Sequence, residues 1–314
     1  MIQAYAFTPP SVEEKSKILL KTFLYFAVFK FPLTKREALA FCQFKTQSID
    51  SELDFLLKEK LIYKIKNLYL PKNEKLWVER RLKGHREAKR IMPKAKKMAH
   101  ILKHFPFVRS IMISGTLAKG YMDQNCDIDF FVITKPGNIT ISKFLIGVSR
   151  RLFFPKGLCV NYIIDTDNLL IEKQNIYSAT EFATLIPVMD SNIFHEFISK
   201  NKHWVTDNLP NYNIQRNISK PIKEAALKIS IEKLLSTKIG NFFETRLQKF
   251  YLKKLSNGKK EHKESFISGE LKIKKGVIKG HNLSYEKTIL GIYNHNKKMI
   301  KENSVMKLDL FFYD

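Results

Sequence analysis

Residues 11–71 have an order of apolar and polar positions that predicts three helices. Ser11 and Glu14 have the spacing of a capping box, and they precede an apolar helix that we expect to end near Phe29. A second, shorter helix is expected to begin at Thr34, where the capping pattern repeats. The third helix is expected to bury one face, made of Ile49, Leu53, Leu56 and Leu57.

A β-hairpin is expected next, over Leu61–Pro71, because apolar residues alternate with lysines there and a turn fits Lys66–Asn67. Three helices followed by a hairpin resemble a winged helix-turn-helix. The third helix would read the DNA groove in such a unit, but it carries four acidic residues: Asp50, Glu52, Asp54 and Glu59. Acidic side chains repel phosphates, so we expect this unit to pack or to bind a partner rather than to read a DNA sequence.

A basic helical connector is expected over residues 74–106. Eleven lysine or arginine residues lie in 75–103, opposed only by Glu79 and Glu87. Pro93 is expected to break this helix into two pieces. The charge either forms a solvated face or faces phosphate groups of a ligand.

Residues 107–175 have the β-α-β-α-β pattern of an α/β core. The expected elements are strands at Val108–Ile113, Asp127–Thr134 and Leu158–Asp165, a short helix after the first strand, and a helix over Ile139–Phe154. The apolar face of that longer helix is expected to be Phe144, Val148 and Leu152.

The C-terminal region, residues 176–314, is expected to be mainly helical. Apolar residues keep helical spacing from Ile222 to Tyr251 and are expected to lie in the core or in helix–helix contacts. A hairpin is expected around Leu271–Ile278, and Phe311 to Tyr313 are expected to dock on the body. The fold class is therefore α/β of the α+β kind, in four parts: a winged-helix-like unit (1–73), the connector (74–106), the core (107–175) and the helical region (176–314).

Composition excludes several classes of protein. With 44% hydrophobic and 12% aromatic residues, extensive disorder is not expected. No apolar run approaches the roughly 20 residues of a membrane span, and the N-terminus lacks the features of a signal peptide. The cysteines, Cys42, Cys126 and Cys159, fit neither a disulfide framework nor a zinc site, so a cytoplasmic location is the simplest expectation.

The formal net charge of +25 is the unusual bulk property of this chain. A surface this basic favours anionic partners, namely nucleic acid, nucleoside triphosphates or an anionic membrane. The alternative is that lysine merely occupies every solvated face.

Candidate chemistry begins at the end of the first core strand, with the loop Ser114-Gly115-Thr116-Leu117-Ala118-Lys119-Gly120. Glycine permits a tight turn and a close approach to a ligand, and amide groups at the start of a helix suit phosphate oxygens. Thr116 adds a hydroxyl and Lys119 a cation. Ser114 is not in a nucleophile elbow, which argues against a serine hydrolase.

Two carboxylates, Asp127 and Asp129, follow in the second core strand. Residues two apart point to the same face of a strand, and adjacent carboxylates repel each other unless a cation lies between them. Carboxylate oxygens favour Mg²⁺ or Mn²⁺, which also bind triphosphate oxygens. A phosphate-binding loop beside a divalent-metal site is what phosphoryl or nucleotidyl transfer requires.

This segment, residues 107–134, resembles the signature of the DNA polymerase β nucleotidyltransferase superfamily, in its minimal and antibiotic-modifying branches. Gly115-Thr116 stands for the usual Gly-Ser, and Cys126 stands for a serine before the first aspartate. The resemblance implies a polymerase-β-like core in which Ser114, Gly115, Thr116, Lys119 and Gly120 bind the nucleotide, and Asp127 and Asp129 bind the metal.

The same resemblance implies a third carboxylate on the next strand, and here the sequence departs from the pattern. Asn161 stands about where that acid is expected, and Asp165 lies four residues further along. An asparagine can ligate Mg²⁺ but cannot take a proton from a hydroxyl group. Either the site works with a weakened or acceptor-assisted base, or a bend brings Asp165 close enough to serve as the acid.

The expected function is transfer of a nucleoside monophosphate from an NTP, expected to be ATP, to an unidentified acceptor, with release of pyrophosphate. The net positive charge is compatible with an anionic acceptor. Two alternatives stay open. One is a nucleotide-binding regulator that has lost turnover, and the other is a nucleic-acid-binding protein in which the charge and the winged-helix-like unit carry the function.

Overall fold

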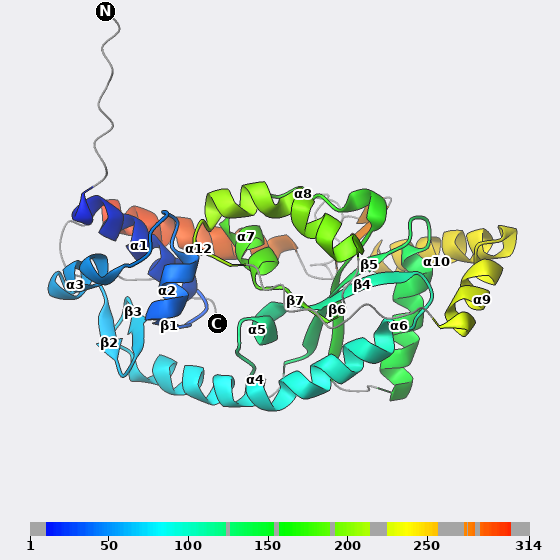
Figure 1. Ribbon diagram of the computed structural model, residues 1–314, viewed down its shortest axis with the longest axis horizontal. Helices are drawn as coiled ribbons and strands as arrows, with labels where there is room; N and C mark the ends of the chain where they lie inside the picture. The colour runs from blue at the N-terminus through cyan, green and yellow to red at the C-terminus, as the bar shows by residue number, and fades with distance from the viewer. Residues whose placement is uncertain are drawn as a thin grey trace, which may run out of the picture. The chain divides into compact units, whose positions relative to one another are not determined.

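The computed structural model describes residues 11–123, 126–153, 157–188, 192–213, 225–256, 273–274, 276–279 and 283–302. The expected docking of Phe311 to Tyr313 lies outside these residues. The chain has the mixed α/β architecture that its sequence predicts (Figure 1).

Two compact units divide the chain. The first contains residues 1–81, 206–213 and 289–314, and the second contains residues 82–205 and 214–288. This division differs from the four expected parts. Segments of the region 176–314 fall in each unit, and the expected connector is divided at residue 81.

The N-terminal part of the first unit, up to residue 71, contains three helices and a three-stranded antiparallel sheet of order β1-β3-β2. Its first elements are α1 (Val12–Ala27), β1 (Leu33–Thr34), α2 (Lys35–Phe41), α3 (Asp50–Lys58), β2 (Tyr63–Ile65) and β3 (Leu68–Leu70). Both predicted capping boxes are present, at Ser11 and at Thr34. The predicted hairpin is also confirmed, because Ile65 pairs with Leu68 across a two-residue turn.

Segments from the C-terminal half complete this unit. Tyr293 of α12 (Leu283–Glu302) packs edge-on against Tyr25, with ring centroids 5.6 Å apart. The ring of Tyr212 packs against Phe41 at 5.2 Å. These contacts join residues that are far apart in the sequence, so no local pattern predicts them.

Helix α4 (Lys75–Leu102) runs through Pro93 without a break, which corrects the expectation of two pieces. A proline inside a helix costs roughly 3 kcal/mol. Burial of an apolar stripe on both sides of the proline offsets that cost: Ala88, Ala95, Met98, Ala99 and Leu102 lie in the core of the second unit.

The second unit is built on a six-stranded mixed sheet of order β7-β4-β5-β6-β9-β8. The strands are β4 (Val108–Ile113), β5 (Ile128–Thr134), β6 (Leu158–Asp165), β7 (Ile186–Pro187), β8 (Ile273–Lys274) and β9 (Val277–Lys279). Strand β5 is antiparallel to β4 and parallel to β6. The pairing of β8 with β9 confirms the predicted hairpin within residues 273–279.

Helices cover both faces of this sheet (Figure 1). Ile128, Phe130 and Val132 of β5 pack with α4 and with α6 (Ile139–Phe153) in the main core. On the other face, Phe131 packs against Phe197 of α8 (Asn192–Asn208), which also contacts Phe182 of α7 (Ile176–Ala183).

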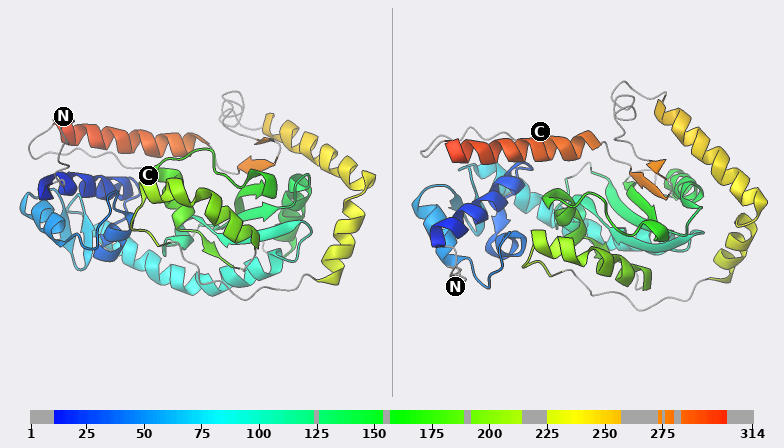
Figure 2. Two further views of the ribbon diagram at one scale, coloured as in Figure 1. Left: turned by 45° about the horizontal axis from the view of Figure 1, so that its top comes forward. Right: turned by 90° about the horizontal axis from the view of Figure 1, so that it is seen from above.

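The expected apolar face of α6 is wrong. Phe144 and Val148 are 41% and 37% exposed, whereas Ile139 and Ile146 are buried. The expected burial of the later helical run is also largely wrong. Its helices α9 (Ala226–Leu235) and α10 (Lys238–Ser256) lie outside the layers that cover the sheet (Figure 2), and many of their apolar side chains face solvent.

Within the described ranges, no helix combines the length and the hydropathy needed to cross a membrane.

Candidate functional site

The glycine loop leaves β4 at Ile113 and enters the one-turn helix α5 (Gly115–Ala118), as the sequence predicts. Gly115 has φ of 66° and Gly120 has φ of 69°, conformations that favour glycine at both ends of the turn. The Ser114 amide donates to the backbone oxygen of Asp129 at 2.9 Å. This hydrogen bond fixes the loop beside the start of β5.

The closest approach in the site is between Gly115 and Asp129. A Cβ atom added to Gly115 would lie 2.2 Å from Oδ2 and 3.0 Å from Cγ of Asp129. A side chain at position 115 would displace this carboxylate, so both the position of Asp129 and the backbone conformation favour glycine there. The structure thus brings together the predicted nucleotide loop and one predicted metal ligand.

The C-terminal end of the loop, at Gly120, packs against α4. The amide of Met122 donates to the backbone oxygen of Gly84 at 3.1 Å, and the ring nitrogen Nδ1 of His85 lies 3.1 Å from the backbone oxygen of Gly120. A Cβ atom on Gly84 would lie 2.1 Å from the ring of Tyr121. Gly84 and His85 were not singled out from the sequence, because only the fold brings this part of α4 to the loop.

Lys119, the predicted phosphate-binding cation, is already held by protein groups. Its ammonium donates to Oε1 of Glu181 at 2.7 Å and to the backbone oxygen of Gly115 at 3.2 Å. The Lys119 side chain is only 15% exposed, and Glu181 on α7 is 32% exposed. A carboxylate therefore lies at the glycine loop, contributed by a helix that comes after the third core strand.

Asp127 lies just before β5, and not within the strand as predicted. The N–H of the next residue, Ile128, donates to the backbone oxygen of Gly157 at 2.8 Å. The Asp127 carboxylate is 3.7 Å from the guanidinium of Arg150 on α6, and both side chains are more than 40% exposed. An ion pair this exposed contributes little free energy, so a competing cation could displace Arg150 from Asp127.

Cys159 lies beside Asp129 on the neighbouring strand, because these two residues are partners in the parallel pairing of β5 with β6. Burial raises the pKa of the Cys159 thiol to about 11, and the charges of Asp129 and Asp127 contribute to that rise. The cations Arg150 and Lys143 oppose the shift. Both aspartates are therefore close enough to influence one thiol, which stays protonated at neutral pH.

Asn161 falls at an irregularity of β6. Phe130 pairs with Val160 and Phe131 pairs with Tyr162, so Asn161 is the extra residue of a bulge. Its side chain lies outside the described part of the structure. The register places Cys159, and not Asn161, directly opposite Asp129.

Asp165 does not reach the aspartate pair. It pairs with Thr134 at the opposite end of β5, five residues or about 17 Å along the strand from Asp129. After the bulge, it also falls on the other face of the sheet. Its carboxylate is buried and accepts hydrogen bonds from the Asp167 amide and from Nδ2 of Asn168, so its role is to cap the 3₁₀ turn η1 (Thr166–Asn168).

The resulting cluster contains two aspartates, a glycine loop and three cations: Lys119, Lys143 and Arg150. Among the residues that the structure describes, no group of three or more His, Cys, Asp or Glu side chains is arranged to hold a metal ion. Mg²⁺ needs only one or two protein carboxylates when phosphate oxygens and water complete its shell. The donors present therefore fit an ion that binds together with an anionic ligand.

Comparison of the chain with models of protein families, with curated proteins and with solved structures finds no match.

Proposed function

We propose that this protein is a metal-dependent nucleotidyltransferase that uses an NTP, and that its site is formed by the loop 114–120 with Asp127 and Asp129. The observation that carries the proposal is the packing of Gly115 against Asp129, so close that a Cβ atom at position 115 would lie 2.2 Å from Oδ2. A glycine turn leading into a helix with no side-chain cap suits phosphate oxygens, and here it adjoins a carboxylate. Strands β4 and β5, which flank the loop and the aspartates, are neighbours in the sheet.

The roles of the chain's own groups follow from their positions. Asp127 and Asp129 would hold Mg²⁺, which when bound neutralises negative charge on the phosphates. Lys119 and Arg150 would offset further phosphate charge, each after exchanging its present carboxylate partner. The reaction would join an acceptor hydroxyl or phosphate oxygen to the α-phosphorus of the NTP, while the bond to pyrophosphate breaks.

The nucleotide-binding regulator is a second candidate, and one observation favours it. The residue opposite Asp129 is a cysteine, and a sulfur ligand does not suit Mg²⁺, which prefers oxygen ligands. Such a site would bind NTP with metal and release pyrophosphate slowly or not at all.

The test is metal-dependent pyrophosphate release from each NTP, with cell extract as the source of acceptor. Asp127→Asn and Asp129→Asn should each abolish it, whereas Asp167→Asn, an exposed aspartate at the other end of the sheet, should leave it unchanged. NTP binding without release by the wild-type protein would support the regulator. Wild-type turnover in both aspartate variants would rule out the proposed site.

A further inference from the structure

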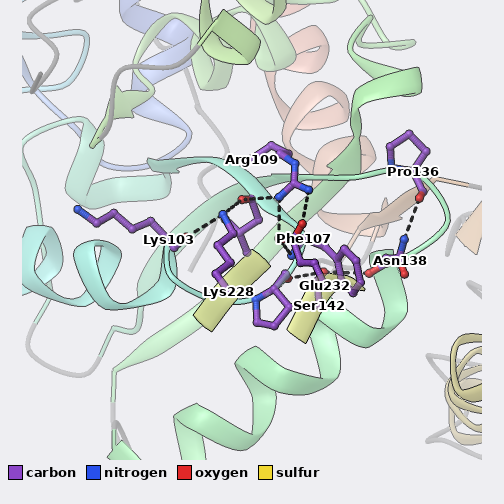
Figure 3. Close-up of polar contacts among 10 residues, drawn as sticks. Lys103, Phe107, Arg109, Pro136, Asn138, Ser142, Lys228 and Glu232 are labelled. Carbon is purple, nitrogen blue, oxygen red and sulfur yellow. Dashed lines mark hydrogen bonds and ion pairs between the residues drawn. The ribbon is translucent and has the colours of Figure 1, made fainter. Parts of the chain in front are cut away.

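The helices α9 and α10 of the second unit turn their acidic side chains toward the body of that unit. In α9, Lys228 is 5% exposed and donates to the backbone oxygen of Val108 at 2.7 Å. Glu232 accepts two hydrogen bonds from Arg109, at 2.9 and 2.6 Å, and one from the amide of Phe107 at 2.7 Å (Figure 3). These bonds attach α9 to the start of β4 and to the residue before it through charged groups.

Helix α10 is attached in a similar way. The carboxylate of Glu244 accepts hydrogen bonds from the amides of Thr140 and Ile141, at 2.8 and 2.7 Å, in the first turn of α6. Tyr251 is half-buried, and the Lys143 ammonium lies 5.5 Å from the centre of its ring. A carboxylate at a helix N-terminus is electrostatically favourable, so the inward position of Glu244 is stable.

Large apolar side chains consequently lie on the solvent side of both helices. Ile239, Phe243 and Phe250 are 61%, 50% and 59% exposed, and their spacing of four and seven residues places them on one side of α10. Phe242, Leu227 and Leu234 are exposed by more than half as well. A surface helix ordinarily buries such a stripe, so these two helices have the reverse arrangement.

The exposed charges described on these two helices are all positive. Glu232 and Glu244 are the only acidic residues of α9 and α10, and both are used internally. The exposed basic residues described in these helices are Lys233, Lys238, Arg246, Lys249 and Lys253. We call these residues, with the six exposed apolar ones, the α9–α10 face.

We propose that the α9–α10 face binds the surface of an anionic lipid bilayer, with the helices lying in the plane of the membrane. Phenylalanine and aliphatic side chains flanked by lysine and arginine form the pattern of helices that lie in the interfacial region. Positive charges near anionic lipid headgroups add to the attraction. Nucleic acid would match the charge, but it would leave the exposed leucine and isoleucine side chains without an apolar partner.

The test is co-sedimentation of the full chain with vesicles, either of phosphatidylcholine alone or of equal parts phosphatidylcholine and phosphatidylglycerol. We expect binding to the mixed vesicles and little to the neutral ones. Phe243→Ser combined with Phe250→Ser should weaken binding roughly a hundredfold, because the apolar surface of two phenylalanine side chains is no longer transferred from water to the bilayer. Lys238→Glu combined with Lys249→Glu should weaken it at least about tenfold.

Matched controls distinguish binding through this face from nonspecific hydrophobic or electrostatic adsorption by other parts of the surface. Leu76→Ser removes another exposed apolar side chain, 68% exposed, and Lys96→Glu with Lys97→Glu makes the same change in net charge on α4. Both controls should bind the mixed vesicles like the wild type. Unfolding midpoints of all variants should stay close to that of the wild type, because the changed side chains are exposed.

Three results would overturn the proposal. The first is equal binding by the phenylalanine variant and the wild type, which would indicate adsorption by charge alone. The second is self-association of the wild type that the same variant abolishes, which would assign the face to a second copy. The third is RNA binding that the phenylalanine variant weakens while vesicle binding is absent.

Discussion

Replacement of Gly115 by alanine should separate the cost of backbone strain from the cost of moving the Asp129 carboxylate. With φ of 66°, an L-residue at position 115 costs about 1–2 kcal/mol. The new Cβ would lie 2.2 Å from Oδ2 and 3.0 Å from Cγ of Asp129, so the carboxylate must move by roughly an ångström to reach ordinary contact distance. The fold can absorb that shift, because it is the end of one side chain that moves.

Gly137→Ala is the matched control. Gly137 has φ of 74°, so alanine meets similar backbone strain, but no atom lies within 4 Å of its added Cβ. Both variants should lose about 1–2 kcal/mol of unfolding free energy. Only Gly115→Ala should lose metal-dependent turnover, by roughly a hundredfold, because a displacement of about 1 Å in a catalytic group has an effect of that size.

The measurements are urea unfolding and metal-dependent pyrophosphate release for the wild type and both variants. If turnover falls equally in Gly115→Ala and Gly137→Ala, loss of activity follows strain, and the contact with Asp129 has no special role. If Gly115→Ala keeps full turnover, the carboxylate position is irrelevant and the proposed site is wrong.

Three further predictions address the surroundings of the site. Glu181→Gln should raise NTP affinity roughly fivefold in equilibrium binding, because it releases Lys119 from a charged partner. Lys119→Ala should lower NTP affinity, and a lower affinity in Glu181→Gln would contradict this electrostatic role. Cys159→Asp should lower thermal stability without metal, because three carboxylates then repel one another, and Mg²⁺ should restore that stability. The same variant should raise turnover more than Asn161→Asp does. Thermal stability of Cys159→Asp that does not change with Mg²⁺ would contradict the placement of residue 159 beside Asp129. The full chain should select no defined sequence from random DNA duplexes, since Asp50, Asp54 and Glu59 are exposed on α3 or at its end, and a reproducible selected site would show the opposite.

Local signals predicted much of the first unit and of the loop. The capping boxes at Ser11 and Thr34 and the turn at Lys66–Asn67 depend on residues within a few positions, and all three are present. The strand ends around Gly115 were also predicted, because glycine, apolar runs and aspartates mark them directly. What these local patterns could not supply is the identity of distant neighbours, such as Gly84 at Tyr121.

Periodicity failed where a helix is held by charged groups. The apolar residues of α9 and α10 have helical spacing, and that spacing alone predicts burial. The apolar sides of these helices instead face solvent, because Glu232 binds Arg109 and Glu244 binds the first turn of α6. Both partners lie about 100 residues away in the sequence. A hydrophobic pattern predicts which side chains share a face of a helix, but it does not predict which face packs against the rest of the domain.

The bulge at Asn161 has the largest consequence for the chemistry. Strict alternation along β6 would put residues 159, 161, 163 and 165 on one face, which made both Asn161 and Asp165 candidates for a third acid. One extra residue reverses the alternation beyond it, so that Tyr162 joins the face of Phe131, and Asp165 joins that of Thr134. Asp165→Asn should therefore cost little stability, because the asparagine oxygen can accept the same hydrogen bonds and cap the turn, and it should leave pyrophosphate release unchanged. If Asp165→Asn abolishes turnover while the protein stays folded, the register of β6 does not describe the active state, and the acid must be sought at this end of the strand.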